Sequence, residues 1–219
     1  MKENNLYQLL KNHLPENAVH YAYDLWAVHG FTFKVTNKRK SKYGDYRFDP
    51  SLNTHTITVN GDLNPYAFLV TYIHEVAHLV VYQTKRKKLA PHGKEWKRSF
   101  QLLMAPMLSN LVFPENILLP LRRYMMNPKA TSSSDPRLSI ALRSYDDNVG
   151  LIALGEVKPG ETFKFNSRLF QKESKRRTRI VCLEVKSGRK YLISQVAMVE
   201  RLEHDPLDKA TLTEEKSFC

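Results

Sequence analysis

The chain has 219 residues, of which 42% are hydrophobic, and a formal charge of +12 at pH 7. A chain of this length can bury one substantial core, or one medium core and a smaller second one. No apolar run approaches the roughly 18 to 20 residues that span a bilayer, so we expect no membrane segment. The amino terminus leads into an amphipathic stretch and not into an apolar signal core, which predicts a cytoplasmic protein.

The two cysteines, Cys182 and Cys219, are far apart in the sequence and form no CxxC pair. This spacing predicts neither a disulfide framework nor a thiolate metal site. Any metal site must therefore use histidine and carboxylate ligands.

Residues 6–29 carry apolar side chains at helical spacing, and Pro15 divides them into two predicted core helices. Three short strand candidates follow at residues 31–35, 46–48 and 54–59, with turn signals at Gly44 and at Asp49-Pro50. We interpret these strands as a small antiparallel meander.

A long helix is predicted after Asp62 or Asn64, either of which can cap it, with Pro65 in its first turn. Its apolar residues cover more than one face, which indicates a buried helix. A second helix is expected to begin near Gly93 and to run through Trp96 and Phe100.

The buried helix contains His74-Glu75-Val76-Ala77-His78, an HExxH pattern. Two histidines four residues apart project from the same side of a helix, so both imidazoles can reach one zinc ion. Glu75 lies beside the first ligand and can receive a proton from zinc-bound water without binding the metal itself. Two unpaired imidazoles facing a core would be costly, and a ligand role removes that cost.

A third histidine, His92, lies 14 residues after His78 and follows Pro91. Three protein ligands and a water molecule form the usual catalytic zinc site. We therefore predict one Zn²⁺ per chain, bound by His74, His78 and His92, with Glu75 as the catalytic residue. Two other interpretations stay open: paired core histidines at positions 74 and 78, and an exposed loop histidine at position 92.

The pattern changes after residue 130. Residues 131–136 are polar, contain Pro136 and lack periodicity, which is typical of a boundary. Five short strands are then predicted between residues 157 and 193, and a small β-barrel or curled sheet fits them. We divide the chain into a first domain (1–129), a linker (130–150), a basic β-domain (151–203) and a flexible tail (204–219).

The HExxH motif together with His92-Gly93-Lys94-Glu95-Trp96 resembles the SprT-like family of zinc metallopeptidases. That family combines HExxH with a later HG pair that is followed, after two further residues, by an aromatic residue. The resemblance covers roughly residues 5–128 and implies an α+β fold, with a small zincin-like domain before the all-β domain. It also implies that His74, His78 and His92 bind zinc, that Glu75 is the general base, and that relatives include spartan-type proteases acting on proteins crosslinked to DNA. Bacterial members commonly end in a zinc ribbon with paired cysteines, which this chain lacks.

Basic residues are concentrated in two segments. Residues 1–129 contain 18 basic and 9 acidic residues, and residues 156–201 contain 12 and 5. Such a surplus favours nucleic acid through counterion release, and a purely solvated surface is the alternative. We predict contacts, to DNA in preference to RNA, from a basic loop and from a hairpin of the β-domain. The loop residues are Lys85, Arg86, Lys87 and Lys88, and the hairpin residues are Lys172, Lys175, Arg176, Arg177 and Arg179.

The favoured function is a SprT-type zinc peptidase acting on protein substrates that are associated with DNA or crosslinked to it. One alternative is a nucleic-acid-binding or regulatory protein with a non-catalytic zinc site, which would not require Glu75. Another is a zinc hydrolase with a non-protein substrate, because metal-activated water does not specify what is cleaved. The sequence does not indicate an oligomeric state.

Overall fold

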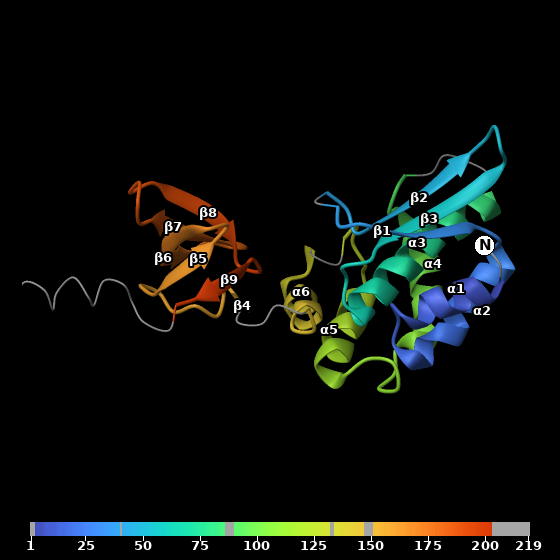
Figure 1. Cartoon of the computed structure of the whole chain (residues 1–219), viewed down its shortest axis with the longest axis horizontal. Helices are drawn as coiled ribbons and strands as arrows, with labels where there is room; N and C mark the ends of the chain where they lie inside the picture. Colours follow the sequence, from blue (N-terminus) through green and yellow to red (C-terminus); the bar gives the residue numbers. More distant parts are fainter. Residues whose placement is uncertain (1–2, 40, 86–89, 132–133, 147–150, 203–219) are drawn as a thin grey trace, which may run out of the picture. The chain divides into compact units, whose positions relative to one another are not determined.

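The computed structural model describes residues 3–39, 41–85, 90–131, 134–146 and 151–202. The chain divides into two compact units, Met1–Asp147 and Asn148–Cys219 (Figure 1). Each unit has its own hydrophobic core. The predicted tail at 204–219 lies outside the described residues. The α+β class is confirmed, because helices and two sheets are both present.

The first unit begins with the two predicted helices, α1 (Glu3–Lys11) and α2 (Val19–His29), which pack against each other. Pro15 and a short 3-10 turn (Glu16–Ala18) separate them. At the end of α2, Gly30 adopts a left-handed conformation with φ of 58°, and its N–H bonds to the carbonyl oxygen of Trp26. Glycine adopts this helix-ending conformation without a Cβ penalty.

The three-stranded sheet differs from the predicted meander. Its strands are β1 (Thr32–Thr36), β2 (Gly44–Asp49) and β3 (Thr54–Asn60), in the order β1-β3-β2. β3 pairs antiparallel with β2 but parallel with β1, so the antiparallel meander was wrong. The connection at residues 37–43 is long enough to cross two strand spacings of about 4.8 Å each, which leaves the central position free for β3.

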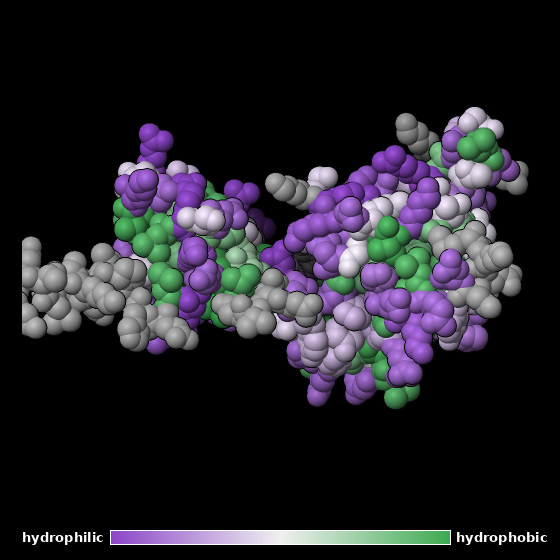
Figure 2. All heavy atoms as spheres, in the orientation of Figure 1, coloured by the Kyte–Doolittle hydropathy of each residue, from purple (hydrophilic) through white to green (hydrophobic). Residues whose placement is uncertain are grey.

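The long helix α3 (Pro65–Lys85) packs against β2, β3 and α4 (Figure 1). Asn64 is its cap, because the Asn64 side-chain oxygen accepts the N–H groups of Tyr66 and Ala67. After α3 come α4 (Lys94–Met104), a 3-10 turn (Ala105–Met107) and α5 (Glu115–Met125). On the face of this unit that Figure 2 shows, hydrophilic residues predominate, with smaller hydrophobic patches between them.

A helix occupies part of the segment that the sequence assigned to a linker. α6 (Pro136–Arg143) begins after Asp135, whose carboxylate accepts the N–H of Leu138 at 3.0 Å. Leu138 and Leu142 are buried in the first core, where α6 packs against α5 and α3. Residues 136–143 therefore belong to the first unit, so the linker assignment was wrong for them.

The second unit contains a six-stranded sheet in the order β4-β9-β5-β6-β7-β8. Its strands are β4 (Leu151–Ala153), β5 (Thr162–Phe165), β6 (Arg168–Lys175), β7 (Arg179–Glu184), β8 (Lys190–Ser194) and β9 (Met198–Arg201). Four of the five predicted strands are present as β5 to β8, but the strand expected at Val157 is not, because this residue lies in a bend; β4 and β9 were not predicted. No pairing joins β4 to β8 within residues 151–202, so the sheet is open; of the two predicted forms, a β-barrel or a curled sheet, the closed barrel is not formed.

In the part of the chain that the structure describes, no helix combines the length and the apolar character that crossing a bilayer requires.

Candidate metal centre

Helix α3 places two of the predicted ligands side by side. His74 and His78 lie one turn apart on α3 and are partly buried, while the neighbouring Ile73, Val76 and Ala77 are fully buried. Because the helix is anchored by its apolar sides, the two imidazoles have a fixed backbone beneath them.

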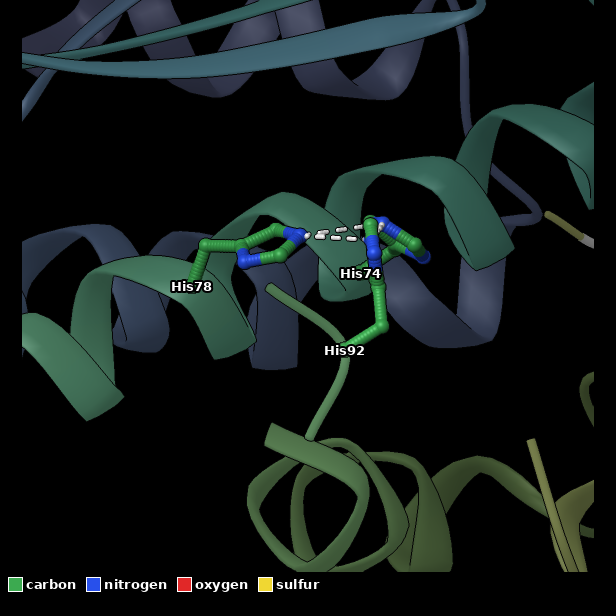
Figure 3. A group of neighbouring side chains, drawn as sticks. All are labelled: His74, His78 and His92. Atoms are coloured by element: carbon green, nitrogen blue, oxygen red, sulfur yellow. Dashed lines mark hydrogen bonds between the residues drawn. The ribbon is translucent and has the colours of Figure 1, made fainter. Parts of the chain in front are cut away.

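The third imidazole comes from the turn before α4. His92 has a left-handed backbone with φ of 60°, and the N–H of Gly93 bonds to the carbonyl oxygen of Ala90 at 3.0 Å. This turn points the His92 ring at the α3 pair (Figure 3). The three Nε2 atoms lie 3.2 Å (His74–His78), 3.1 Å (His78–His92) and 3.2 Å (His74–His92) apart.

These distances fit a metal ion. Nitrogen ligands about 2.0–2.1 Å from a tetrahedral zinc ion lie about 3.3 Å from one another. Three ring nitrogens at close range cannot satisfy each other fully, because each neutral imidazole has one donor and one acceptor nitrogen. A cation at the centre would satisfy all three. His74, His78 and His92 therefore form a cluster compatible with one metal ion.

The electrostatics of the cluster favour neutral imidazoles, the form that binds metal. Burial lowers the pKa of His74 to about 3 and the pKa of His78 to about 4, and each value also reflects the neighbouring rings. Burial lowers the pKa of His92 as well.

Aromatic side chains from α4 support the rings from below. Trp96 is buried, with its ring centroid 4.6 Å from that of His74, 5.4 Å from that of His78 and 4.7 Å from that of His92. Its Nε1 donates to the carbonyl oxygen of His74 at 3.4 Å. Phe100, one turn further along α4, stacks on Trp96. The aromatic residue four positions after His92 thus forms the floor of the cluster.

Glu75 lies beside the cluster with only 7% of its surface exposed. Burial raises the pKa of Glu75 to about 8, and the Asp45 carboxylate adds to the rise, while Arg39 and Lys42 oppose it. A carboxyl group with such a pKa is a stronger base than an exposed glutamate once it is ionised.

One cavity holds these groups together. It has a volume of about 540 Å³, and both the three histidines and Glu75 line it. The opposite wall comes from the β1–β2 connection and β2, and a third side comes from the end of α5 and the segment after that helix. The wall residues from these segments are Ser41, Lys42, Tyr43, Gly44, Asp45, Tyr46, Tyr124, Ala130 and Thr131.

Gly44 makes this arrangement possible. A Cβ atom at position 44 would lie 2.6 Å from Glu75 Oε1 and 2.7 Å from Thr71 Cγ2, so only glycine lets β2 approach α3 this closely. In the sequence Gly44 was only a turn signal, because nothing local shows which helix residue it will face.

Asn60 holds the wall opposite the histidines and was also missed. Its side chain is 1% exposed and donates to the carbonyl oxygen of Lys42 at 3.0 Å, while its Oδ1 accepts Arg39 Nε at 2.7 Å. Lys42 in turn pairs with Asp45 at 2.8 Å. A buried asparagine at the end of a strand was the available signal, since such an amide needs partners.

The predicted nucleic-acid contacts fall into three groups. Arg86, Lys87 and Lys88 lie outside the described residues, and for Lys85 the structure describes the backbone alone. The second group is exposed in or beside the β6–β7 turn: Lys175, Arg176, Arg177 and Arg179.

Lys172 forms the third group, and its assignment to a surface was wrong. It is 6% exposed, and its Nζ donates to the carbonyl oxygens of Leu154 and Gly155, both at 3.1 Å, and of Val157. In β6, Lys172 lies two positions after the buried Phe170, so the strand alternation turns both side chains inward.

Comparison with known families decides the relationship of the first unit. Residues 8–113 match the model of the SprT-like family. These residues belong to the SprT-like family. The match includes the HExxH helix and His92. SprT-like domains are generally of the zinc metallopeptidase type, so the family and the histidine cluster agree. Searches of curated proteins and of solved structures give no significant match to this chain.

The family match ends before the cavity does. Tyr124, Ala130 and Thr131 line the cavity but follow residue 113, as do α5, α6 and the second unit. One wall of this SprT-like site is therefore built by a part of the chain outside the matched span.

Proposed function

We propose that the SprT-like unit is a zinc-dependent peptidase. One observation carries this proposal: three Nε2 atoms converge within 3.1–3.2 Å of one another, and a buried carboxylate, Glu75, opens onto the same cavity. A structural zinc site is closed by four protein ligands, whereas a catalytic site keeps one position for water or substrate. Among the described residues, no fourth protein ligand joins the three histidines.

The chemistry divides between the metal and Glu75. Zinc bound by His74, His78 and His92 would supply a Lewis acid that polarises the scissile carbonyl and acidifies a water molecule. Glu75 is placed to accept a proton from water in this cavity and would deliver it to the nitrogen of the leaving amine. Because Glu75 is buried, the proton that it accepts is shielded from bulk water. The backbone N–H of Tyr46 hydrogen-bonds to the carboxyl group and orients it.

The cavity wall suits an extended peptide. β2 lies at the edge of the sheet, and within the described residues it pairs only with β3. Its residues Gly44, Asp45 and Tyr46 face the cavity, so an extended substrate strand could pair with the free edge beside Glu75. Pairing of this kind reads the peptide backbone, and cleavage would then depend little on the substrate's side chains.

Proteins associated with DNA or crosslinked to it are the proposed substrates. The support is electrostatic: Lys175, Arg176, Arg177 and Arg179 are exposed on one turn of the second unit, and none forms an ion pair with another described residue. Four other cations of this unit, Lys164, Arg168, Lys190 and Arg201, each form an ion pair with a glutamate. A phosphate backbone would therefore find its most favourable electrostatic interaction in the second unit at this turn.

The test compares the native chain with a Glu75→Gln variant on a DNA-bound basic protein. We expect one zinc per chain in both proteins by elemental mass spectrometry, and loss of cleavage by at least about a hundredfold in the variant, as for removal of a general base. A His92→Ala variant should lose zinc and cleavage together. Equal cleavage by the native and Glu75→Gln proteins would contradict the proposal, and zinc binding without any cleavage would favour a non-catalytic regulatory site.

A further inference from the structure

A second cavity lies on the other side of His92. It has a volume of about 520 Å³ and is formed by one face of α4 and the end of α5, with His92, Gly93, Lys94, Lys97, Arg98, Gln101, Met126, Asn127 and Pro128 as its lining. We call it the α4 groove. It shares His92 with the metal centre, and the chain that follows α5 lines both spaces, with Asn127 in the groove and Thr131 in the metal cavity.

The α4 groove is cationic. Lys94, Lys97 and Arg98 lie at the helical spacing that puts them on one face, and no acidic side chain lines the groove. None of the three forms an ion pair with another residue of the described ranges; Lys97 instead donates to the side-chain oxygen of Asn127 at 2.8 Å. Three uncompensated charges in a concave surface create a strong local potential for anions.

The sequence around the groove residues is rich in basic residues. Residues 85–98 contain seven basic residues and one acidic residue, Glu95.

The lining also contains neutral groups that suit nucleotides. Gln101 Nε2 donates to the carbonyl oxygens of Met125 and Met126, and Asn127 Oδ1 accepts Lys97 Nζ, so Gln101 Oε1 and Asn127 Nδ2 are the amide atoms that can hydrogen-bond to a nucleotide. Met126 is 81% exposed at the rim, where its apolar surface could contact a base. A concave groove with amides fits a flexible chain of phosphates and bases better than a flat lipid surface. An acidic peptide has no bases that could pack against the apolar side chain of Met126.

We propose that the α4 groove binds single-stranded nucleic acid through Lys94, Lys97 and Arg98. A strand in this groove lies next to His92, so a protein attached to that strand is held beside the metal centre. The positioning of an attached protein for cleavage rests on the proposed peptidase function, whereas binding of the strand to the groove does not.

The test measures the binding of a fluorescent oligothymidylate by anisotropy over a series of salt concentrations. The groove variant is Lys94→Gln/Arg98→Gln, and the matched control is Lys11→Gln/Lys34→Gln, which removes the same charge from exposed sites elsewhere on this unit. Both pairs are also made in a chain carrying Arg176→Gln/Arg177→Gln, so that binding by the second unit cannot hide the effect.

We expect the groove variant to bind about tenfold more weakly, with a salt slope smaller by about 1.4 because two phosphate contacts are lost. The control should change affinity less than about twofold. Photocrosslinking with an iodouracil-containing strand should label peptides from residues 93–101 or 126–128. Equal weakening by both pairs would show diffuse charge attraction only and would overturn the proposal, as would crosslinks confined to the second unit.

Two further arms separate other partners and the catalytic question. Vesicles containing phosphatidylserine, or polyglutamate, should bind no more weakly to the groove variant than to the control; a selective loss there, without one for the oligonucleotide, would assign the groove to lipids or acidic proteins. Zinc content and cleavage of an unattached protein are measured on the same samples. If the oligonucleotide binds the groove but no protein is cleaved, the peptidase proposal fails and the groove stands; if cleavage occurs without selective binding, the reverse holds.

Discussion

Gly44 sets the distance between β2 and the Glu75 carboxyl group. We predict that Gly44→Ala displaces Glu75, because the added Cβ would lie 2.6 Å from Glu75 Oε1. Zinc should stay bound, while cleavage should fall about tenfold to a hundredfold, the effect of a misplaced catalytic group.

The matched control is Gly61→Ala, whose Cβ would meet the apolar Val35 Cγ1 at 2.7 Å, away from Glu75. Both variants should lose about 1–3 kcal/mol of stability through overpacking, measured by denaturant unfolding. A loss of activity in the Gly61 variant equal to that in the Gly44 variant, compared per folded molecule, would show that general strain explains the effect.

Lys172 stabilises the second unit from inside. We predict that Lys172→Met lowers the free energy of unfolding of this unit by about 2–4 kcal/mol, because three carbonyl oxygens lose their charged donor. Hydrogen exchange at the β6 and β7 amides would measure the loss. Lys175→Met, which removes the same charge from an exposed position, should leave exchange unchanged; comparable exchange in both variants would contradict the role of Lys172.

The sequence predicted those site residues that lie close to one another along the chain. His74, Glu75 and His78 follow from helical spacing alone, and His92 from its distance along the chain to a helix start. Gly44 and Asn60 could not be identified because their partners, Glu75 and Lys42, are set by how β2 and β3 pack. Lys172 is different: strand alternation from Phe170 carried the signal, but the run of nearby cations suggested a surface.

Among the elements, the helices were easier to predict than the pairing of strands. α1, α2, α3 and α4 follow from apolar spacing, from the break at Pro15 and from the Asn64 cap. The strands β1, β2 and β3 were found in the right places, but hydrophobic alternation is the same for parallel and antiparallel neighbours. It therefore gave no information about the insertion of β3 between β1 and β2.

Helix α6 completes the first core although it comes after the polar segment. Truncation after residue 129 would remove the buried Leu138 and Leu142 and would expose the core surface that they cover. It would also remove the carbonyl oxygen of Leu142, which accepts a hydrogen bond from Asn64 Nδ2 at 2.8 Å. Burial of two leucines contributes about 3–6 kcal/mol, a large part of the stability of a typical domain.

We therefore predict that a fragment of residues 1–147 folds cooperatively, whereas a fragment of residues 1–129 melts at a markedly lower temperature or aggregates. Circular dichroism melting of the two fragments is the measurement. Equal melting temperatures would show that α6 contributes little to the core.

The whole molecule consists of two units with separate cores, and the metal cluster belongs to one of them. We predict that chelation destabilises the first unit and leaves the second unchanged. A ligand present at a thousand times its dissociation constant stabilises the folded state by about 4 kcal/mol, and chelation removes this contribution.

Tryptophan fluorescence reports the effect selectively, because Trp26 and Trp96, the two tryptophans of the chain, are both in the first unit. Trp96 also lies against the histidine rings, so its emission should respond directly to metal. Hydrogen exchange of the second unit serves as the internal control. An equal loss of protection in both units on chelation would contradict the separation.

Composition and charge predicted this division well, since the basic surplus and the change from helical to strand periodicity mark two parts. They did not place the boundary, because the polar residues 131–135 look like a linker while a packed helix comes directly after them. Nor did they separate paired from unpaired cations in the second unit, which depends on cross-strand neighbours such as Arg168 and Glu184.

The origin of the three ligands on two different segments has a consequence for how metal enters and leaves. His74 and His78 are in place as soon as α3 is folded, whereas His92 must adopt a left-handed backbone, which is uncommon for a residue with a side chain. We therefore expect the centre to assemble in two steps. His74 and His78 on the folded helix would bind the ion first, and the turn before α4 would then bring His92 as the third ligand. Exchange of the ion with solution would begin when the turn moves His92 away from the ion. The rate of exchange would then depend on the backbone conformation of His92 and not on the helix.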